Sequence, residues 1–185
     1  MTTNPFVTLD LDTLSTLKPL RRVVYSLGGN VGDVPETLQQ AVRHLARTPN
    51  LIVTGVSRVF STEPWGGVAQ PDFLNIVLLA ESTMPSTVLL ERALAVEDAL
   101  GRVRGEHWGP RTIDIDLIRV GARVRNDPHL VLPHPHAHER AFVLVPWLDV
   151  EPSAELPGHG YVADLVAGLD TSGVRLVPDV RIDLP

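Results

Sequence analysis

Residues 21–47 read RRVVYSLGGNVGDVPETLQQAVRHLAR. The first part of this stretch, over 22–27, is rich in β-branched and aromatic residues, which predicts a short strand that ends at a pair of glycines. Asp33 then lies three residues before a glutamate, with a proline between them, and this pattern is typical of the start of a helix. Because apolar residues follow at helical spacing, we expect a helix over 34–47.

The same alternation of strand and helix patterns continues to residue 120. The remaining elements of this region are β-rich runs over 51–61 and 73–80, a helix over 85–100 and a strand over 112–120. The order β-α-β-β-α-β is typical of the ferredoxin-like α+β fold, in which both helices cover one face of an antiparallel sheet. The expected C-terminal additions are a loop, a short helix over 137–148, and a helix and strand over 161–168 and 174–178.

The composition indicates one globular domain. The chain has 185 residues, of which 44% are hydrophobic and 21% are charged, so it has enough apolar matter for a core. Residues 1–20 lack a clear period, and we expect a weakly ordered N-terminal extension there, followed by a single domain over 21–185. Because no stretch matches a signal peptide or a membrane span, we expect a soluble cytoplasmic protein.

Charge and cysteine content exclude several function classes. The formal net charge is −6, so we expect no nucleic-acid partner and no membrane partner, because both need a broad basic face. The absence of cysteine removes disulfides, thiolate zinc sites and cysteine nucleophiles. An anionic small-molecule substrate remains compatible with this composition wherever a few basic residues are concentrated.

The strongest single candidate for chemistry is Asp114-Ile115-Asp116, on the strand predicted over 112–120. Alternate side chains of a strand share a face, so the two carboxylates are expected about 7 Å apart on one side. They repel each other unless a cation joins them, and Mg²⁺ favours carboxylates together with substrate phosphates and water. The alternative interpretation is a solvated strand face that binds no ligand.

A glycine-rich basic loop precedes the two aspartates. It contains Arg102, Arg104 and Arg111, whose planar guanidinium groups suit phosphate oxygens, and Trp108, which is suited to covering a bound ligand. The glycines allow such a loop to change shape. The alternative is that these arginines only neutralise neighbouring carboxylates as surface ion pairs. Beside the aspartate pair, phosphate and metal binding is the favoured interpretation.

Further polar residues are weaker candidates. Glu97 lies on the flank of the apolar stripe of the second predicted helix, either as a solvated residue or as one that reaches a ligand in the next loop. Asn30, in the turn after the first strand, is a candidate hydrogen-bond donor to a ligand. His134, His136 and His138 alternate, but adjacent prolines disfavour a strand. Contact of one histidine with a phosphate or base is therefore favoured over a metal site.

The chain also contains four ordered motifs, SLGGNVGD, EPWGGVAQPDFLN, GRVRGEHWGPRTIDIDLI and LPHPHAHERAFVL. Together they resemble the hydroxymethyldihydropterin pyrophosphokinase family of folate biosynthesis, over about residues 22–155. The third motif is the most specific, because its proline, arginine, threonine and two acids keep a fixed spacing. The resemblance implies transfer of the terminal diphosphate of ATP to the hydroxymethyl group of 6-hydroxymethyl-7,8-dihydropterin, with release of AMP.

The resemblance also implies roles at the phosphate side of the site. Asp114 and Asp116 match the pair that holds two Mg²⁺ ions, and with Arg102 and Arg111 they form the expected catalytic set. ATP is the implied co-substrate. The expected ATP contacts are Glu97, Arg102, Arg104, Trp108, Arg111, His134 and Arg140.

Pterin recognition is implied for a second group of residues. The expected pterin contacts are Asn30, Thr62, Glu63, Trp65, Phe73, Asn75, Asp114 and Phe142. A flat heteroaromatic ring gains stacking energy between Phe73 and Phe142, and the Asn75 amide can pair with its edge. Phe73 and Asn75 share a face of the predicted strand by parity, which is consistent with this arrangement.

Three residues depart from the pattern of the family. Gly29 stands where the family often has serine, and Leu94 and Pro135 stand where some members have polar or aromatic neighbours of the nucleotide.

Association with other folate enzymes is compatible with the N-terminal extension. The alternatives are an RNA-binding or ligand-sensing module, which 5% aromatic residues and the acidic charge disfavour, and a zinc hydrolase built on the histidines.

Overall fold

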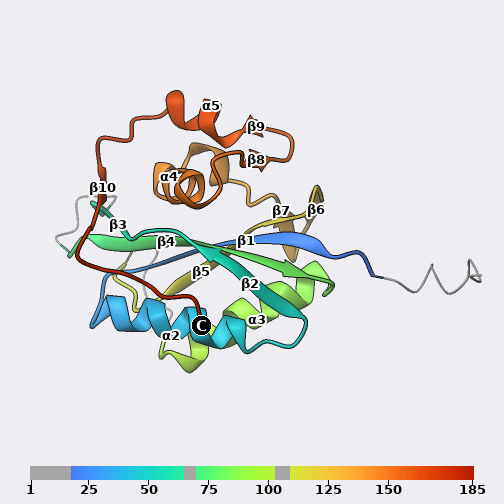
Figure 1. Cartoon of the computed structure of the whole chain (residues 1–185), viewed down its shortest axis with the longest axis horizontal. Helices are drawn as coiled ribbons and strands as arrows, with labels where there is room; N and C mark the ends of the chain where they lie inside the picture. The colour runs from blue at the N-terminus through green and yellow to red at the C-terminus, as the bar shows by residue number, and fades with distance from the viewer. Residues whose placement is uncertain (1–17, 65–69, 103–108) are drawn as a thin grey trace, which may run out of the picture.

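Within residues 18–64, 70–102 and 109–185, which the computed structural model describes, a six-stranded antiparallel sheet forms the centre of the protein (Figure 1). The strand order is β10-β3-β4-β1-β5, and β2 also pairs with β4. The elements from β1 to β5 are β1 (Arg21–Gly29), α2 (Val34–Ala46), β2 (Leu51–Val56), β3 (Phe60–Thr62), β4 (Phe73–Ser82), α3 (Ser86–Ala99) and β5 (Asp114–Val120). The predicted N-terminal extension lies largely outside the described residues, since 1–17 are not among them.

The helices form a layer on each face of the sheet. Both α2 and α3 cover one face, whereas the C-terminal helices cover the other (Figure 1). The elements after β5 are β6 (Arg125–Asp127), β7 (Leu130–Leu132), the 3₁₀ helix η1 (Ala137–Glu139), α4 (Ala141–Val150), β8 (Glu155–Leu156), β9 (Gly160–Tyr161), α5 (Val162–Ala167) and β10 (Val174–Leu176). The predicted α+β class is confirmed, with an antiparallel sheet and helices.

Three details differ from the predictions. The single β-rich run over 51–61 is two strands, because Ser57 interrupts it and its hydroxyl accepts a hydrogen bond from the N–H of Val77, at 2.9 Å. The helix expected over 137–148 is η1 followed by α4, since Arg140 between them is extended. The region expected as a loop contains the β6–β7 hairpin, and β8–β9 is a further hairpin that the sequence did not indicate.

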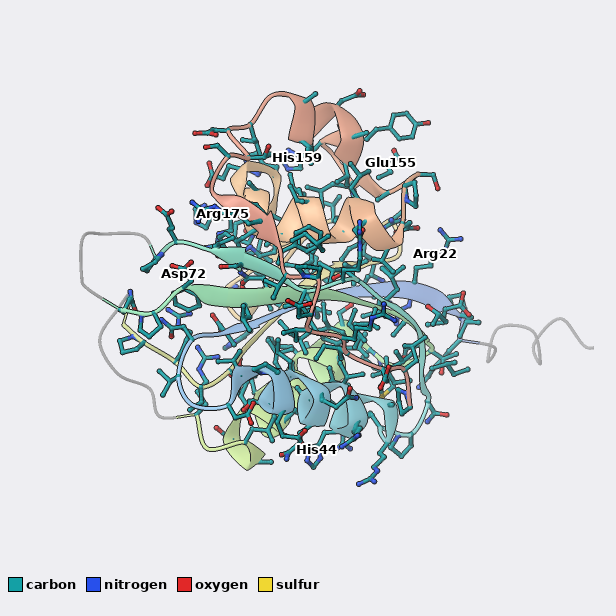
Figure 2. All side chains as sticks on the ribbon, turned by 60° about the vertical axis from the view of Figure 1, so that its left-hand side comes forward. Arg22, His44, Asp72, Glu155, His159 and Arg175 are labelled. Carbon is teal, nitrogen blue, oxygen red and sulfur yellow. The ribbon has the colours of Figure 1, made fainter. Side chains whose placement is uncertain are left out.

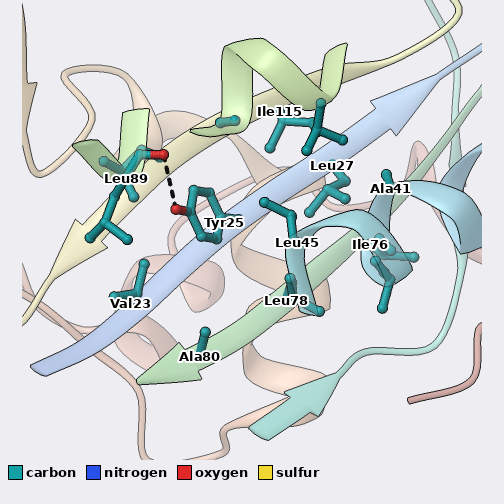
Figure 3. Packing of buried hydrophobic residues seen from close by; sticks show 14 of the residues in the cluster. Val23, Tyr25, Leu27, Ala41, Leu45, Ile76, Leu78, Ala80, Leu89 and Ile115 are labelled. Atoms are coloured by element: carbon teal, nitrogen blue, oxygen red, sulfur yellow. Dashed lines mark hydrogen bonds between the residues drawn. The ribbon is translucent and has the colours of Figure 1, made fainter. Parts of the chain in front are cut away.

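The main hydrophobic core lies between the sheet and the helices α2 and α3. Leu27 and Leu78 from the sheet pack with Leu45 of α2 and Leu89 of α3, and all four are fully buried (Figure 3). The Tyr25 hydroxyl donates a hydrogen bond of 3.1 Å to the carbonyl of Leu89, and burial raises the pKa of Tyr25. This bond ties the central strand β1 to α3.

A second cluster packs the opposite face of the sheet against α4. It includes Val24 and Val77 from the sheet and Val143 and Trp147 from α4, all of them buried. Figure 2 shows His159 in this outer layer and His44 of α2 on the far side of the sheet. Val77 of β4 faces α4. Since side chains alternate along a strand, Asn75, two residues earlier, lies on the same face.

The C-terminal segment joins the two layers at the edge of the sheet. After β10 pairs with β3, the chain continues past the sheet to α2 (Figure 1). Val180 and Ile182 pack against the main core, and Gln39 of α2 exchanges two hydrogen bonds with the main chain of Asp183, at 3.0 and 2.8 Å. In the part of the chain that the structure describes, no helix is long and apolar enough to cross a membrane.

Candidate active site

Asp114 and Asp116 lie on the face of the sheet that packs against α4. Asp116 pairs with Ser26 in β1, and Ser26 pairs in turn with Val77, which belongs to the cluster beneath α4. Residues directly opposite each other in an antiparallel pair point to the same face. The two aspartates therefore share one face, as the strand alternation predicts, while Ile115 between them is buried in the main core.

The same face brings the aspartates into line with the predicted pterin residues. Asp114 pairs with Gly28, Gly28 pairs with Asn75, and Asn75 pairs with Phe60, so one row crosses four strands. Gly28 leaves this row open, because a Cβ at its position would lie 2.6 Å from the Asn75 amide oxygen. Residues far apart in sequence are thus assembled on one surface.

Arginines surround the Asp114 carboxylate. Arg102 forms an ion pair of 2.6 Å with one of its oxygens, and Arg111 forms a short ion pair with the other. Both guanidinium groups are partly exposed on the side chain, at 20% and 28%. They are therefore positioned to exchange this carboxylate for the oxygens of an anionic ligand. Arg104 and Trp108 lie outside the described residues.

Asp116 is partly exposed and is less closely paired with cations than Asp114. Its carboxylate is 3.6 Å from the guanidinium of Arg140 and 3.9 Å from Nε2 of His134. Burial, and then the negative charge of Asp114, raise the pKa of Asp116 to about 6. A bound cation would favour the ionised form of Asp116, because it offsets the negative charge of the neighbouring Asp114.

The donor set fits Mg²⁺ bound together with a phosphate ligand. No group of three or more histidine, aspartate or glutamate side chains in the described residues could hold a metal by itself. Mg²⁺ is commonly held by one or two carboxylates and completes its shell with phosphate oxygens and water. Asp114 and Asp116 supply that number of hard oxygen donors on one partly exposed surface.

His134 is held as a neutral hydrogen-bond donor. Its Nδ1 accepts the backbone N–H of His136 at 3.2 Å, so the ring proton resides on Nε2, the atom that faces Asp116. Burial, followed by the charge of Arg140, lowers the pKa of His134 to about 4. The imidazole is therefore uncharged at neutral pH.

The other two histidines of the cluster point to different partners. His136 pairs with Glu139, at 2.6 Å, whereas His138 stacks on His159 with 4.2 Å between ring centroids. The three alternating histidines do not converge, so the alternative of a histidine metal site has no support in these residues.

Glu97 reaches the site indirectly. Only 2% of it is exposed, and its carboxylate accepts the backbone N–H of Ile115 at 2.6 Å and a short hydrogen bond from Arg102. Burial raises the pKa of Glu97 to about 7, although both hydrogen bonds oppose this shift. Where the sequence predicted a contact with ATP, the structure shows a buried group that supports β5 and Arg102.

The predicted pterin residues gather around Asn75. This side chain is buried, and its amide donates a hydrogen bond of 2.8 Å to the hydroxyl of Thr62. Phe73 lies two residues away on the same face and is half-buried. Phe142, at the start of α4, is half-buried with the Arg140 guanidinium 5.6 Å from its ring centroid.

Two other predicted pterin contacts are arranged differently. Glu63 is exposed and forms an ion pair of 2.7 Å with Arg175 of β10, and Trp65 lies outside the described residues. The Asn30 side chain donates both amide hydrogens within the protein, to the Gln70 side chain at 3.1 Å and the Pro71 carbonyl at 3.0 Å. In this structure it has no amide hydrogen left for a ligand.

Comparisons with known proteins agree with this geometry. Residues 24–152 match the family model described as 7,8-dihydro-6-hydroxymethylpterin-pyrophosphokinase (HPPK). The chain belongs to the HPPK family. Relatives named 2-amino-4-hydroxy-6-hydroxymethyldihydropteridine pyrophosphokinase include one from Methylorubrum extorquens, 42% identical over 158 residues, which spans 85% of this chain and 99% of the relative. Another, from Mycobacterium leprae, is 46% identical over 174 residues and spans 85% and 89%.

Solved structures show the same fold at low sequence identity. The HPPK-DHPS protein of Plasmodium falciparum, solved with pteroate, aligns with a TM-score of 0.64 and 13% identity over 84% of this chain. The aligned part is 45% of that longer chain, so this chain spans less than half of it. At this identity the similarity supports the HPPK fold alone.

Beside Asp116, the chain has a cavity of about 250 Å³ that the sequence did not reveal. Its lining includes Asp116 and His134 together with the apolar side chains Leu90, Leu117 and Leu130. The outer wall is the β6–β7 hairpin, whose strands of three residues are too short to show a strand period. The Asp127-Pro128 turn was the available signal, because such pairs favour turns.

Proposed function

We propose that this chain transfers the terminal diphosphate of ATP to the hydroxymethyl oxygen of 6-hydroxymethyl-7,8-dihydropterin and releases AMP, a step of tetrahydrofolate biosynthesis. The observation that carries this proposal is the row from Asp114 through Gly28 to Asn75 on one face of the sheet. This row supports a metal and phosphate site beside a site for a flat ring with polar edges. Membership of the HPPK family supports the same reaction.

The phosphate side combines carboxylates with guanidinium groups. Asp114 and Asp116 would hold magnesium, with two ions expected from the family resemblance. Bound magnesium neutralises phosphate charge and lowers the pKa of the attacking hydroxyl. Arg102 and Arg111 would leave Asp114 to grip the transferred phosphates, and Arg140 beside Asp116 adds a third cation. We keep Arg104 and Trp108 as proposed ATP contacts.

The nucleoside would occupy the cavity next to Asp116. Its leucine side chains suit a base, and Asp116 is part of its lining. His134 presents a neutral N–H toward this edge, so it can donate to a phosphate oxygen without adding charge. Glu97 contributes by holding Arg102 and β5 in place.

The pterin would lie over β4 and β3. Asn75, held by Thr62, would present its amide to the ring edge, and Phe73 and Phe142 would provide the stacking faces. Asp114 would then lie beside the hydroxymethyl group. Glu63 and Trp65 remain proposed contacts of the same pocket.

Several wider assignments remain proposals. The strand order β5-β1-β4-β2, antiparallel throughout, supports a ferredoxin-like core, and we assign residues 21–185 to a single catalytic domain. A cytoplasmic location and the absence of nucleic-acid and membrane partners are expected from the composition. The Plasmodium falciparum protein is named HPPK-DHPS, a name that joins two activities, so association with another folate enzyme is a further proposal.

A nucleotide product assay tests the proposed reaction. The protein is incubated with ATP, Mg²⁺ and the hydroxymethyl pterin, and the nucleotides are separated; AMP formation that requires the pterin is expected. Asp116→Asn should reduce turnover at least about 1,000-fold, because it removes charge stabilisation in the transition state. Asp164→Asn, an exposed position on α5, is the matched control and should leave turnover unchanged. ADP as the product, or no turnover by the wild type, would refute the proposal.

A further inference from the structure

The strand β10 is the outermost strand of the described sheet, and its presence makes β3 an inner strand rather than an edge strand. Its three residues pair antiparallel with β3, with Val174 opposite Thr62 and Leu176 opposite Phe60. β10 comes after residues 24–152, which match the HPPK family model. Thr62 is the last residue of β3, and the end of a short strand opens readily unless neighbouring strands hold it.

Arg175 makes the backbone hydrogen bonds that join β10 to β3. The N–H of Val177, directly after β10, donates to the carbonyl of Val59 at 2.9 Å. Hydrogen-bonded and non-hydrogen-bonded residue pairs alternate along an antiparallel ladder. Arg175 and Ser61 are therefore the next hydrogen-bonded pair, and their N–H and C=O groups face each other.

The substrate face of this sheet edge contains Thr62. Thr62 lies opposite Phe73, which shares a face of β4 with Asn75, and residues opposite each other point to the same face. The half-buried Val174 therefore flanks Thr62 on this face, on the side away from β4. On the side toward β4, the Thr62 hydroxyl accepts the Asn75 amide at 2.8 Å. Thr62 is thus enclosed between β10 and the amide that it holds.

Polar contacts hold the reverse face of the same edge. Arg175 forms an ion pair of 2.7 Å with Glu63, the residue directly after β3. The Ser61 hydroxyl donates to the carboxylate of Asp72, directly before β4, at 3.1 Å. Figure 2 shows Arg175 and Asp72 at this edge of the molecule. Because the ion pair with Glu63 is exposed, its contribution is small, and the backbone pairing is the stronger part of the attachment.

We propose that β10 positions Thr62 for pterin binding and that Arg175 is the positioning residue through which it does so. The inference rests on the proposed function, in which the Asn75 amide meets the edge of the pterin ring. Thr62 fixes the orientation of that amide, so a shift of β3 misaligns it. Arg175 lies on the reverse face of the sheet and acts through β3, without contact to the substrate. Asp114 and Asp116 lie on β5 at the opposite edge, so ATP binding should not depend on β10.

The test compares two proline variants of β10. Arg175→Pro removes the N–H that donates to Ser61 and the charge that pairs with Glu63, so β10 should detach from β3. We expect the KM for the pterin to rise about ten-fold, while the KM for ATP and kcat stay within about two-fold of the wild type. Steady-state kinetics with each substrate varied in turn gives all three values.

Leu176→Pro is the matched control for this change. By the same alternation, the N–H of Leu176 points away from β3, and its side chain is 39% exposed. Proline is tolerated on an edge strand where the missing N–H would face solvent. This variant should therefore keep the wild-type KM for both substrates.

Two conservative variants separate the backbone pairing from the charge. Arg175→Lys keeps the N–H and the positive charge and should have the wild-type KM for the pterin. Arg175→Ala keeps the N–H alone, so its KM for the pterin should rise less than about three-fold, because exposed ion pairs are weak.

The outcomes decide between a positioning role and a general structural one. If Arg175→Pro does not fold, Val174→Ala removes the side chain beside Thr62, and its KM for the pterin should rise about three-fold. An unchanged KM for the pterin in Arg175→Pro, or in Val174→Ala where that variant is used, would overturn the inference. Equal rises for both substrates, or a rise of the same size in Leu176→Pro, would also overturn it. A wild type that forms no AMP would instead refute the proposed function.

Discussion

The backbone N–H of Ile115 donates a buried hydrogen bond of 2.6 Å to the carboxylate of Glu97, 18 residues earlier in the chain. Ile115 lies between the two aspartates on β5, an edge strand whose outer N–H groups have no neighbouring strand in the described sheet. Glu97 therefore supplies the acceptor that a further strand would provide. It also holds Arg102, so the end of α3 and the aspartate pair are fixed together.

Replacing Glu97 should show how much its hydrogen bonds to Ile115 and Arg102 stabilise the protein. Glu97→Ala leaves the buried N–H of Ile115 without an acceptor and removes one of the two carboxylate partners of Arg102, and we expect it to lower the free energy of unfolding by about 3 kcal/mol. Glu97→Gln keeps an acceptor and should cost about 1 kcal/mol. Urea denaturation gives both values. Glu91→Ala, on the exposed face of the same helix, is the control, and an equal loss in all three variants would contradict this account.

The pH dependence of stability should report the ionisation of Glu97. Burial raises its pKa in the folded protein to about 7, above the ordinary value of 4.5. Because the folded state holds the proton more tightly, the stabilisation is complete below pH 4.5 and is lost as the pH rises through about 7. The difference in unfolding free energy between the wild type and Glu97→Gln should therefore fall by about 2 kcal/mol over this range. A difference that does not vary with pH would show that Glu97 has an ordinary pKa.

The sequence carried enough local information to predict the core elements. The strand before the glycine pair, the helix that Asp33 begins and the acid-bearing strand all lie within a few residues of their predicted bounds. Each has a strong period or a clear cap, and these are local properties. The shared face of Asp114 and Asp116 follows from strand alternation alone.

What the sequence could not reveal depends on contacts between distant residues. A glutamate on the flank of an amphipathic helix looks solvated, and only the position of Ile115 shows that Glu97 is buried. The internal hydrogen bonds of Asn30 could not be predicted for the same reason, because the acceptors of its amide lie 40 and 41 residues away in the sequence. The cavity wall at β6–β7 was missed because a strand of three residues has no readable period.

Gly28→Ala should impair pterin binding selectively. A Cβ at this position would lie 2.6 Å from the amide oxygen of Asn75, so the amide must rotate away from its present position. We expect the KM for the pterin to rise about ten-fold while the KM for ATP changes by less than about two-fold. Steady-state kinetics with each substrate varied in turn measures both. Gly173→Ala, where an added Cβ meets no atom within 4 Å, is the matched control, and a parallel rise in both KM values would show a general distortion.

Gln39→Ala should weaken the attachment of the C-terminal segment without affecting the chemistry. The Gln39 amide, 8% exposed, makes two hydrogen bonds with the main chain of Asp183, next to Ile182 in the core. Removing it takes away two partly buried hydrogen bonds to the main chain of the exposed Asp183, so the free energy of unfolding should fall by about 1 kcal/mol. Gln40→Ala, which removes only an exposed bond to Glu36, should cost less than about 0.5 kcal/mol. Because the contact lies on the α2 side of the sheet, the KM for each substrate should stay unchanged; a raised KM for the pterin in the folded variant would instead show that the residues after β10 also position β3 and Thr62.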